Sequence, residues 1–245
     1  MKKCIKIILI LLLLSIFIYC TYNVINYLKN EYKNVKLNSN IQKIAIKEVI
    51  IDNDNKPNDI SPIQVDFDKL DDVNNNIQAW IYLNDSNINY PIVQGNDNNY
   101  YLSKTVDGDY NPNGSLFIDY RNSKDFSDPN TYIYGHNMKN DTMFGDLEKY
   151  KKQEYYDNHK EMYILTRKNQ YKLEVFAGYT TEDGSEIYNF IGNDSNERLI
   201  ELAMSKSDFS SDVKVDYNDK VVVLSTCSYD YENARYVLIG VLRKI

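Results

Sequence analysis

The segment DKVVVLSTCSYDYENARYVLIGVLR, residues 219–243, is the most informative part of the chain. It contains two apolar runs rich in β-branched residues, Lys220–Thr226 and Tyr236–Leu242, joined by a short polar connection. Neither run alternates cleanly between apolar and polar residues, which predicts strands buried on both faces of a sheet or barrel. A connection this short lets the strands pair as antiparallel neighbours. We therefore expect Cys227, which ends the first strand, and Arg235, which opens the second, at the same end of the sheet.

Residues 1–28 predict a membrane anchor. Three lysines within Met1–Lys6 precede the almost wholly apolar run Ile7–Cys20, and the apolar character continues to Leu28. This supplies the roughly 20 apolar residues that a bilayer requires. The leading lysines predict a cytoplasmic N-terminus with the remainder outside the cell. A cleaved signal peptide is the alternative, but no small-residue cleavage site follows the apolar run. We expect a single-pass protein of the cell membrane with an extracellular domain.

The remainder divides into a stalk and one folded domain. Residues 29–62 are rich in Asn, Lys and Asp, and Asp52–Asp59 has no apolar residue, which favours an extracellular stalk with at most a short helix at Ile41–Ile51. Residues 63–245 remain as a single domain.

Short sequence patterns predict that this domain is mainly β. Asp66–Trp80 spaces apolar residues three and four apart and predicts an amphipathic helix. Further helices or helical turns are predicted at Asp141–Tyr150, Tyr155–Lys160 and Asp194–Lys206. Besides the terminal pair, strands are predicted at 81–83, 88–93, 115–120, 131–134, 162–166, 171–179 and 213–215. About eight short strands with a few inserted helices most simply form a closed barrel.

Charge and cysteine content narrow the function. All 35 acidic residues and all but three of the 28 basic residues follow the anchor, so the exported part carries about −10, which argues against nucleic acid as a partner. Its one cysteine, Cys227, has no partner for a disulfide and is flagged as a reactive thiol, with a small buried residue as the alternative. One cysteine and two distant histidines, His136 and His159, do not form a ligand set, so we expect no metal and no other cofactor.

A cysteine nucleophile needs a neighbouring cation or base, because the free thiol is only a few per cent ionised near neutrality. His136 directly follows a predicted strand, and the glycine before it permits a tight turn that aims the imidazole over the end of the sheet. A structural role for this histidine is the alternative. Arg235, opposite Cys227, is suited to donate to an oxyanion, or else forms a salt bridge with Glu232 or Asp230.

Several blocks of sequence occur in an order typical of a known family. The run L-S-T-C at Leu224–Cys227 is followed by an arginine eight residues later, and Y-G-H-N at Tyr134–Asn137 lies about ninety residues before the cysteine. The other blocks are INYPIVQ at Ile88–Gln94, GSLFIDYRN at Gly114–Asn122 and TMF at Thr142–Phe144. From about Asp66 to the C-terminus the chain resembles the sortases, specifically the class B sortases of Gram-positive bacteria.

This resemblance implies a fold and an activity. The fold is an eight-stranded closed sortase-type β-barrel with added N-terminal helices and a helix inserted before the penultimate strand. The activity is that of a membrane-anchored cysteine transpeptidase, which cleaves a C-terminal sorting motif of secreted proteins through a thioacyl intermediate. The cleaved protein passes to an amine of cell-wall peptidoglycan or of its lipid-linked precursor.

The resemblance also implies roles for individual residues. By motif, the nucleophile is Cys227, the histidine is His136 and the arginine is Arg235. Alignment by eye places five residues at the bound peptide, namely Asn98, Leu102 and Ser225 near it and Ile187 and Tyr188 as walls of its groove.

Two other functions stay open at this point. A secreted cysteine peptidase would use the same three residues but let water resolve the thioester. A non-enzymatic, membrane-anchored binding module would keep Cys227 as a buried core residue. A thiol-specific alkylating reagent separates the last case from the others, because a catalytic cysteine reacts quickly in the folded domain.

Overall fold

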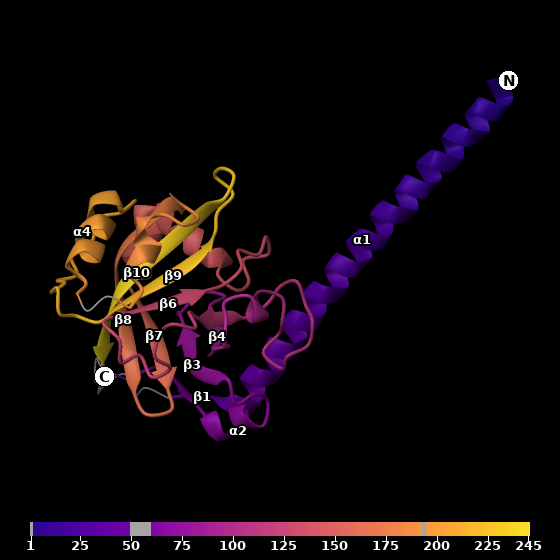
Figure 1. The fold of residues 1–245 in the computed structure, drawn as a ribbon. Helices are drawn as coiled ribbons and strands as arrows, with labels where there is room; N and C mark the ends of the chain where they lie inside the picture. The colour runs from indigo at the N-terminus through magenta and orange to yellow at the C-terminus, as the bar shows by residue number, and fades with distance from the viewer. Residues whose placement is uncertain (1, 50–59, 193–194) are drawn as a thin grey trace.

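The computed structural model describes residues 2–49, 60–192 and 195–245. Eight strands close into a barrel in the order β10-β8-β7-β3-β4-β5-β6-β9 (Figure 1). This confirms the predicted eight-stranded barrel. Its strands are β3 (Ile77–Tyr82), β4 (Asn89–Val93), β5 (Leu116–Ile118), β6 (Asn130–Tyr134), β7 (Glu161–Thr166), β8 (Gln170–Glu182), β9 (Val221–Cys227) and β10 (Ala234–Lys244).

Helices and a small hairpin surround the barrel. The helix α4 lies between β8 and β9, which confirms the helix predicted before the penultimate strand. Two short strands, β1 and β2, pair with each other outside the barrel. The bounds are α1 (Lys2–Ala45), β1 (Ile46–Glu48), β2 (Ile63–Val65), α2 (Phe67–Asp71), α3 (Gln153–Asn158) and α4 (Glu197–Lys206), with 3₁₀ helices η1 (Tyr100–Leu102), η2 (Gly145–Lys151) and η3 (Glu186–Phe190).

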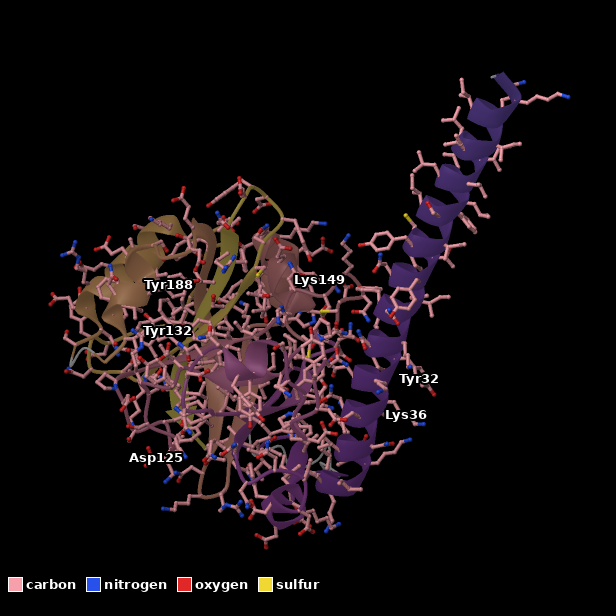
Figure 2. The ribbon with its side chains drawn as sticks, turned by 45° about the vertical axis from the view of Figure 1, so that its right-hand side comes forward. Tyr32, Lys36, Asp125, Tyr132, Lys149 and Tyr188 are labelled. Atoms are coloured by element: carbon pink, nitrogen blue, oxygen red, sulfur yellow. The ribbon has the colours of Figure 1, made fainter. Side chains whose placement is uncertain are left out.

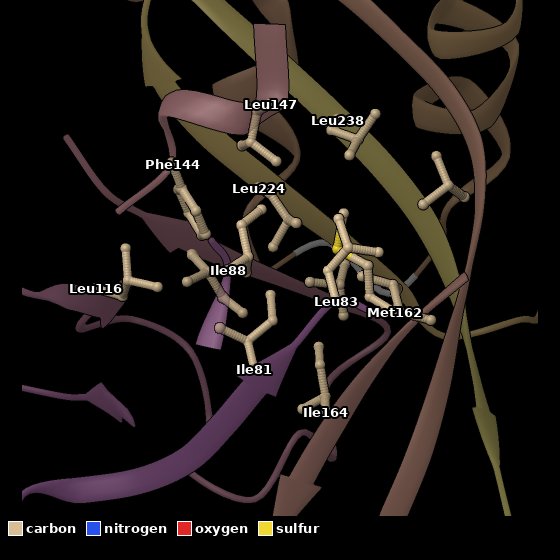
Figure 3. Packing of buried hydrophobic residues seen from close by; sticks show 14 of the residues in the cluster. Ile81, Leu83, Ile88, Leu116, Phe144, Leu147, Met162, Ile164, Leu224 and Leu238 are labelled. Atoms are coloured by element: carbon tan, nitrogen blue, oxygen red, sulfur yellow. The ribbon is translucent and has the colours of Figure 1, made fainter. Parts of the chain in front are cut away.

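The barrel interior is filled by alternate residues from all eight strands. Figure 3 shows side chains of this cluster converging, among them Ile81 of β3, Leu116 of β5 and Leu224 of β9. These three side chains are at most 1% exposed. Burying a side chain of this size contributes about 1.5–3 kcal/mol relative to leaving it in water. The inward face is therefore the main source of the barrel's stability.

The outward face of the last two strands is apolar as well, which explains why neither run alternates. Val221 and Val223 of β9 and Val237 and Ile239 of β10 pack beneath α4 and η3. On the other side of the barrel, the outer faces of β3, β4 and β5 are covered by α2 and the end of α1. Tyr134, at the end of β6, contacts both outer clusters, so it marks the boundary between the two covers.

The predicted helix over Asp66–Trp80 is wrong beyond its first residues. Only Phe67–Asp71 is helical, and Ile77 already opens β3. The chain turns in between, where the Asn74 side chain accepts a hydrogen bond from the Asn76 amide at 2.8 Å. Side chains that bond their own backbone in this way compete with a helix. The apolar spacing of three and four came from a short helix followed by a buried strand.

The predicted strand over Val213–Val215 is also wrong, since these residues adopt no regular structure. Both valines are nevertheless partly buried against the cluster beneath α4. Their apolar character therefore reflects packing of a connecting segment.

The segment predicted to be a stalk differs from that expectation over its first half. The helix α1 runs without a break through Ala45 (Figure 1). Asn34, Asn38, Ile41 and Ala45 fall on one face and are buried against the barrel domain. The predicted short helix at Ile41–Ile51 is instead the last turn of α1 followed by β1. Its final two positions and the polar run 52–59 lie outside the described residues.

Two polar side chains fasten the end of α1 to the barrel. Asn34 Nδ2 donates to the Gly114 carbonyl at 3.2 Å, and Gln42 Nε2 donates to the Asn89 carbonyl at 2.7 Å. Tyr32 and Lys36 lie on the opposite, exposed side of the helix (Figure 2). Among the described residues, α1 is the one helix long and apolar enough to cross a membrane. The sequence did not indicate that the end of α1 packs against the barrel, because two of its buried positions are asparagines.

Candidate active site

An open groove of about 380 Å³ lies where the two covers of the barrel leave the strand ends bare. Residues Ser225 and Cys227 continue the outward face of β9 beyond the valines that α4 covers, and Arg235 does the same on β10. The groove is lined by Cys227, His136 and Arg235 together. The structure thus brings the three predicted catalytic residues to one place.

The strand pairing fixes the position of Arg235 relative to Cys227. The two residues are direct partners in the antiparallel register of β9 and β10. Direct partners have Cβ atoms about 5 Å apart, within reach of a long arginine side chain. Cys227 is a free thiol, partly exposed to the groove. A fixed positive charge therefore lies beside an accessible sulfur.

The ion pair of Arg235 is with a residue that the sequence did not indicate. Its Nη2 lies 3.0 Å from Asp183 Oδ2, and its Nη1 donates to the Ala234 carbonyl at 3.2 Å. Of the two partners considered from the sequence, Asp230 pairs with Lys151 instead, at 2.7 Å. The Arg235 and Asp183 side chains are 25% and 60% exposed. Exposed pairs contribute little, so Arg235 can exchange this partner for another anionic oxygen.

His136 follows β6 and is held by the glycine before it. The Gly135 amide donates to the Ser225 carbonyl at 3.1 Å, which extends the parallel pairing of β6 with β9. A Cβ at Gly135 would lie 2.2 Å from Leu116 Cδ2 and 2.7 Å from Phe144 Cδ2. The glycine is therefore required for space, whereas the sequence suggested a turn-forming role.

The His136 ring is oriented by one hydrogen bond. Its Nε2 lies 2.8 Å from the carbonyl oxygen of Leu102. A carbonyl only accepts, so Nε2 carries the hydrogen. The other ring nitrogen, Nδ1, is then the atom left to exchange a proton with a ligand. Leu102 itself lines the groove, so the predicted peptide-binding loop also orients the histidine.

The backbone beneath Leu102 is closely packed. Gly114 has a φ of +56°, and a Cβ there would lie 2.7 Å from the Leu102 carbonyl oxygen and 2.6 Å from the Tyr101 carbonyl oxygen. Glycine adopts this conformation without steric cost. The close packing of Gly114 therefore helps to fix the Leu102 carbonyl that accepts from His136.

A buried carboxylate holds the loop that carries Asn98. Asp119 is 0% exposed. It accepts hydrogen bonds from Asn98 Nδ2 at 2.8 Å and from the Tyr134 hydroxyl at 3.0 Å. Arg121 also donates to it through two side-chain nitrogens. Burial alone would raise the pKa of Asp119, but hydrogen bonds from Arg121 and Asn98 outweigh it and lower that pKa. The carboxylate stays ionised and joins two residues of the groove wall, Asn98 and Tyr134.

Four of the five residues predicted to bind the peptide line the groove, and one does not. Asn98, Leu102, Ser225 and Tyr188 are in its lining. The prediction for Ile187 is wrong, because this side chain is fully buried beneath α4. Consecutive residues of η3 point in different directions, so only one of this pair faces the groove.

Tyr188 closes one side of the groove. Its ring stacks on Tyr134 with centroids 6.5 Å apart, and its hydroxyl lies 2.8 Å from Ser225 Oγ. Figure 2 shows Tyr188 beside Tyr132, whose hydroxyl donates to the Ile187 carbonyl. Burial raises the pKa of Tyr188 to about 12, so the phenol keeps its proton at neutral pH. The wall is aromatic and uncharged.

The described residues contain no candidate metal centre. Across residues 2–49, 60–192 and 195–245, no group of three or more His, Cys, Asp and Glu side chains is arranged to hold an ion.

Sequence reasoning missed several residues of this site. Asp183 had no signal in the sequence, because it meets Arg235 only through the closed sheet. Asp119 lies two residues before its partner Arg121, but its contacts with Asn98 and Tyr134 form only in the folded barrel. Tyr134, the last residue of β6, lies two residues before His136. Residues two apart in a strand point to the same face, so the sequence could have indicated that Tyr134 lies on the side of His136.

The chain is similar in sequence and in structure to sortases. The family described as the sortase domain matches residues 81–243. Sortase B of Staphylococcus aureus is 30% identical over 249 residues, covering 100% of this chain and 99% of that protein. The solved complex of S. aureus sortase B with substrate has a TM-score of 0.68 and 32% identity, covering 73% of this chain and 85% of that one. A structure of sortase B complexed with triglycine has a TM-score of 0.67 and 33% identity, covering 73% and 86%.

Proposed function

Because the chain belongs to the sortase family and has class B sortases as relatives, we propose specific roles for the residues of its groove. The chain is a cysteine transpeptidase that anchors proteins to the cell wall. The observation that supports the assignment is that Cys227, His136 and Arg235 line one groove although they come from three different strand ends. In the proposal they are the nucleophile, the general acid and base, and the oxyanion donor.

The first half of the reaction forms a thioester. The Cys227 thiolate attacks the carbonyl carbon at the cleavage site, and the new oxyanion is stabilised by the Arg235 guanidinium. The C–N bond then breaks while His136, as imidazolium, gives its Nδ1 proton to the leaving amine. Nε2 keeps its hydrogen bond to Leu102 throughout, so the ring does not have to turn.

The second half transfers the acyl group. An amine enters the space left by the departing peptide and attacks the thioester carbon. Neutral His136 takes a proton from this amine, the C–S bond breaks, and the thiolate and imidazolium are restored. Water attacking in place of the amine would give hydrolysis, which is the reaction of the peptidase alternative.

The partners follow from the same groove. Relatives have been solved with a substrate and with triglycine, which supports a sorting peptide and an amine as the two reactants here. We assign the acceptor amine to cell-wall peptidoglycan or its lipid-linked precursor. The peptide would lie along Asn98, Leu102, Ser225 and Tyr188.

The arrangement in the cell is part of the proposal. Residues 1–28 would form the cytoplasmic tip and transmembrane anchor, which the exposed apolar side chains of α1 support. Residues 29–62 would connect the anchor to the extracellular catalytic domain, residues 63–245.

The experiment that tests this function supplies both reactants. The full chain in detergent is incubated with a library of fluorophore-quencher sorting peptides, with and without triglycine, and products are identified by mass spectrometry. We expect cleavage with formation of a peptide–triglycine product. Cleavage that yields only the free acid at every amine concentration would identify a peptidase. Binding without cleavage across the library would favour the non-enzymatic alternative.

Replacing Arg235 by alanine should lower the acylation rate by about 10²–10³-fold, because the developing oxyanion loses its charged donor. Arg235→Lys should recover only part of the loss, since an ammonium lacks the planar fork of guanidinium. The measurement is single-turnover thioester formation. Arg167→Ala removes an arginine of the opposite region, paired with Asp68 and Asp71, and should act like wild type. An Arg235→Ala rate within threefold of wild type would remove the arginine from the mechanism.

A further inference from the structure

A carboxylate outside the groove links the neighbours of two catalytic residues. Glu148 lies on η2, which packs against β10 and β8. Its Oε2 accepts from Asn137 Nδ2 at 2.6 Å, and its Oε1 accepts from Ser228 Oγ at 2.6 Å. Asn137 directly follows His136, and Ser228 directly follows Cys227. One side chain therefore joins the segment of the histidine to the segment of the nucleophile.

The link is reinforced by Asn137 itself. The same Nδ2 that donates to Glu148 also donates to the Cys227 carbonyl at 2.9 Å. The Tyr229 hydroxyl, on the other segment, donates back to the Asn137 carbonyl at 3.0 Å. The two segments belong to strands that are parallel neighbours, and beyond the strand ends these contacts replace the sheet pairing.

Glu148 is held in place by a cation of its own. Lys151, one turn later on η2, lies 2.6 Å from Glu148 Oε1 and 2.7 Å from Asp230 Oδ2. Burial alone would raise the pKa of Glu148, but hydrogen bonds from Lys151, Ser228 and Asn137 outweigh it and lower that pKa. The carboxylate is therefore ionised at neutral pH and acts as a double acceptor.

The burial of its partners makes the link specific. Asn137 is 9% exposed and Ser228 is 6% exposed, so neither can readily replace Glu148 with bulk water. Losing an acceptor costs a buried donor more free energy than an exposed hydrogen bond contributes. Without Glu148 each donor keeps one acceptor, the Cys227 carbonyl for Asn137 and Asp230 for Ser228, but the carboxylate that joins the two donors is lost.

We propose that Glu148 is a positioning residue that sets the distance and orientation of His136 relative to Cys227. It touches neither substrate nor the reacting atoms; it acts through Asn137 and Ser228. The inference rests on the proposed roles of His136 and Cys227, and it adds a residue from a helix that lies outside the groove. A misplacement of about 1 Å between catalytic groups can cost on the order of 10²-fold in rate.

The first test does not require turnover. In the full chain, the rate at which iodoacetamide alkylates Cys227 is measured against pH for wild type and Glu148→Gln, with product assigned by peptide mapping. Removing a negative charge would by itself favour the thiolate and move the profile to lower pH. Displacing His136 from its place beside Cys227 in the groove removes a cation that favours the thiolate and moves the profile to higher pH, and this is the shift we expect. An unchanged profile or a shift to lower pH would overturn the proposal.

The second test measures transfer. We expect Glu148→Gln to lower kcat by about 10–30-fold while KM for the sorting peptide stays within twofold, because the groove wall is untouched. Glu154→Gln, on the exposed surface of α3, is the matched control and should match wild type. A loss shared equally between kcat and KM, or one that disappears below the melting transition, would contradict a positioning role.

A third variant separates charge from reach. Glu148→Asp keeps the charge but is one methylene shorter, so it reaches only one of its two donors. Its alkylation profile should lie between those of wild type and Glu148→Gln. Full activity in the aspartate variant would show that the bridge between the two segments is unnecessary. If wild type itself transfers nothing while the alkylation shift appears, the proposed function fails and the positioning role stands.

Discussion

Replacing Cys227 by alanine should abolish both the thioacyl intermediate and the transfer product, with a fall in rate of at least about four orders of magnitude. The reaction as proposed has no other nucleophile, since Cys227 supplies the one sulfur among the residues that line the groove. The measurement is mass spectrometry of the intact protein after rapid mixing with a sorting peptide. Wild type should gain the mass of the acyl fragment and the variant should gain nothing.

The control for this prediction is the other described free cysteine. Cys20→Ala removes an exposed thiol on α1, remote from the groove, and should leave acylation and transfer unchanged. Iodoacetamide should label Cys227 quickly in the Cys20→Ala protein. Transfer product formed by Cys227→Ala above the rate without protein would rule out thioester chemistry.

Replacing His136 by glutamine should lower transfer by about 10²–10⁴-fold. Glutamine keeps a donor that can reach the Leu102 carbonyl, so the loop should stay in place, but it cannot give and regain a proton near neutral pH. Both half-reactions lose proton transfer, so the defect appears in acylation and in aminolysis alike. The measurement is the rate of each half-reaction under single-turnover conditions.

An ester substrate tests whether His136 acts as the general acid. An ester analogue of the sorting peptide has a leaving group that needs little protonation, so His136→Gln should acylate with the ester far closer to the wild-type rate than with the peptide. His159→Gln is the matched control, since His159 stacks on Tyr155 on α3 and bonds the Tyr155 carbonyl. Equal defects with ester and peptide would remove His136 from the role of general acid.

The part of the fold that was predictable from sequence is the part governed by local burial. The two terminal runs are apolar on both faces because the barrel fills one side and α4 covers the other, and this gave the strands and their pairing. The prediction of one helix over Asp66–Trp80 was wrong, because the apolar spacing there does not come from a single element. A five-residue helix and a buried strand together produced a helical spacing of apolar residues. The asparagines between them are the residues that indicate a turn.

The candidate site was predictable only where the chain brings residues together over short separations. Cys227 and Arg235 are joined by a hairpin, so their register followed from the sequence. His136 was found from its position after a predicted strand and then through a motif, but its partner Leu102, at the end of η1, is 34 positions away. Asp183 and Glu148 meet the site only through β8 and η2, so nothing in their local sequence marked them.

The unbroken course of α1 has a consequence for which substrates are accessible. Asn111 Nδ2 donates to the Asn30 carbonyl at 2.8 Å, so the barrel domain is held to the helix two residues after Leu28. Two residues advance a helix by about 3 Å. In the proposed membrane arrangement the barrel domain would be held at a fixed height close to the lipid surface. A secreted protein therefore needs enough flexible chain between its own folded part and its sorting motif to span that narrow layer, and proteins with shorter tethers would remain unanchored.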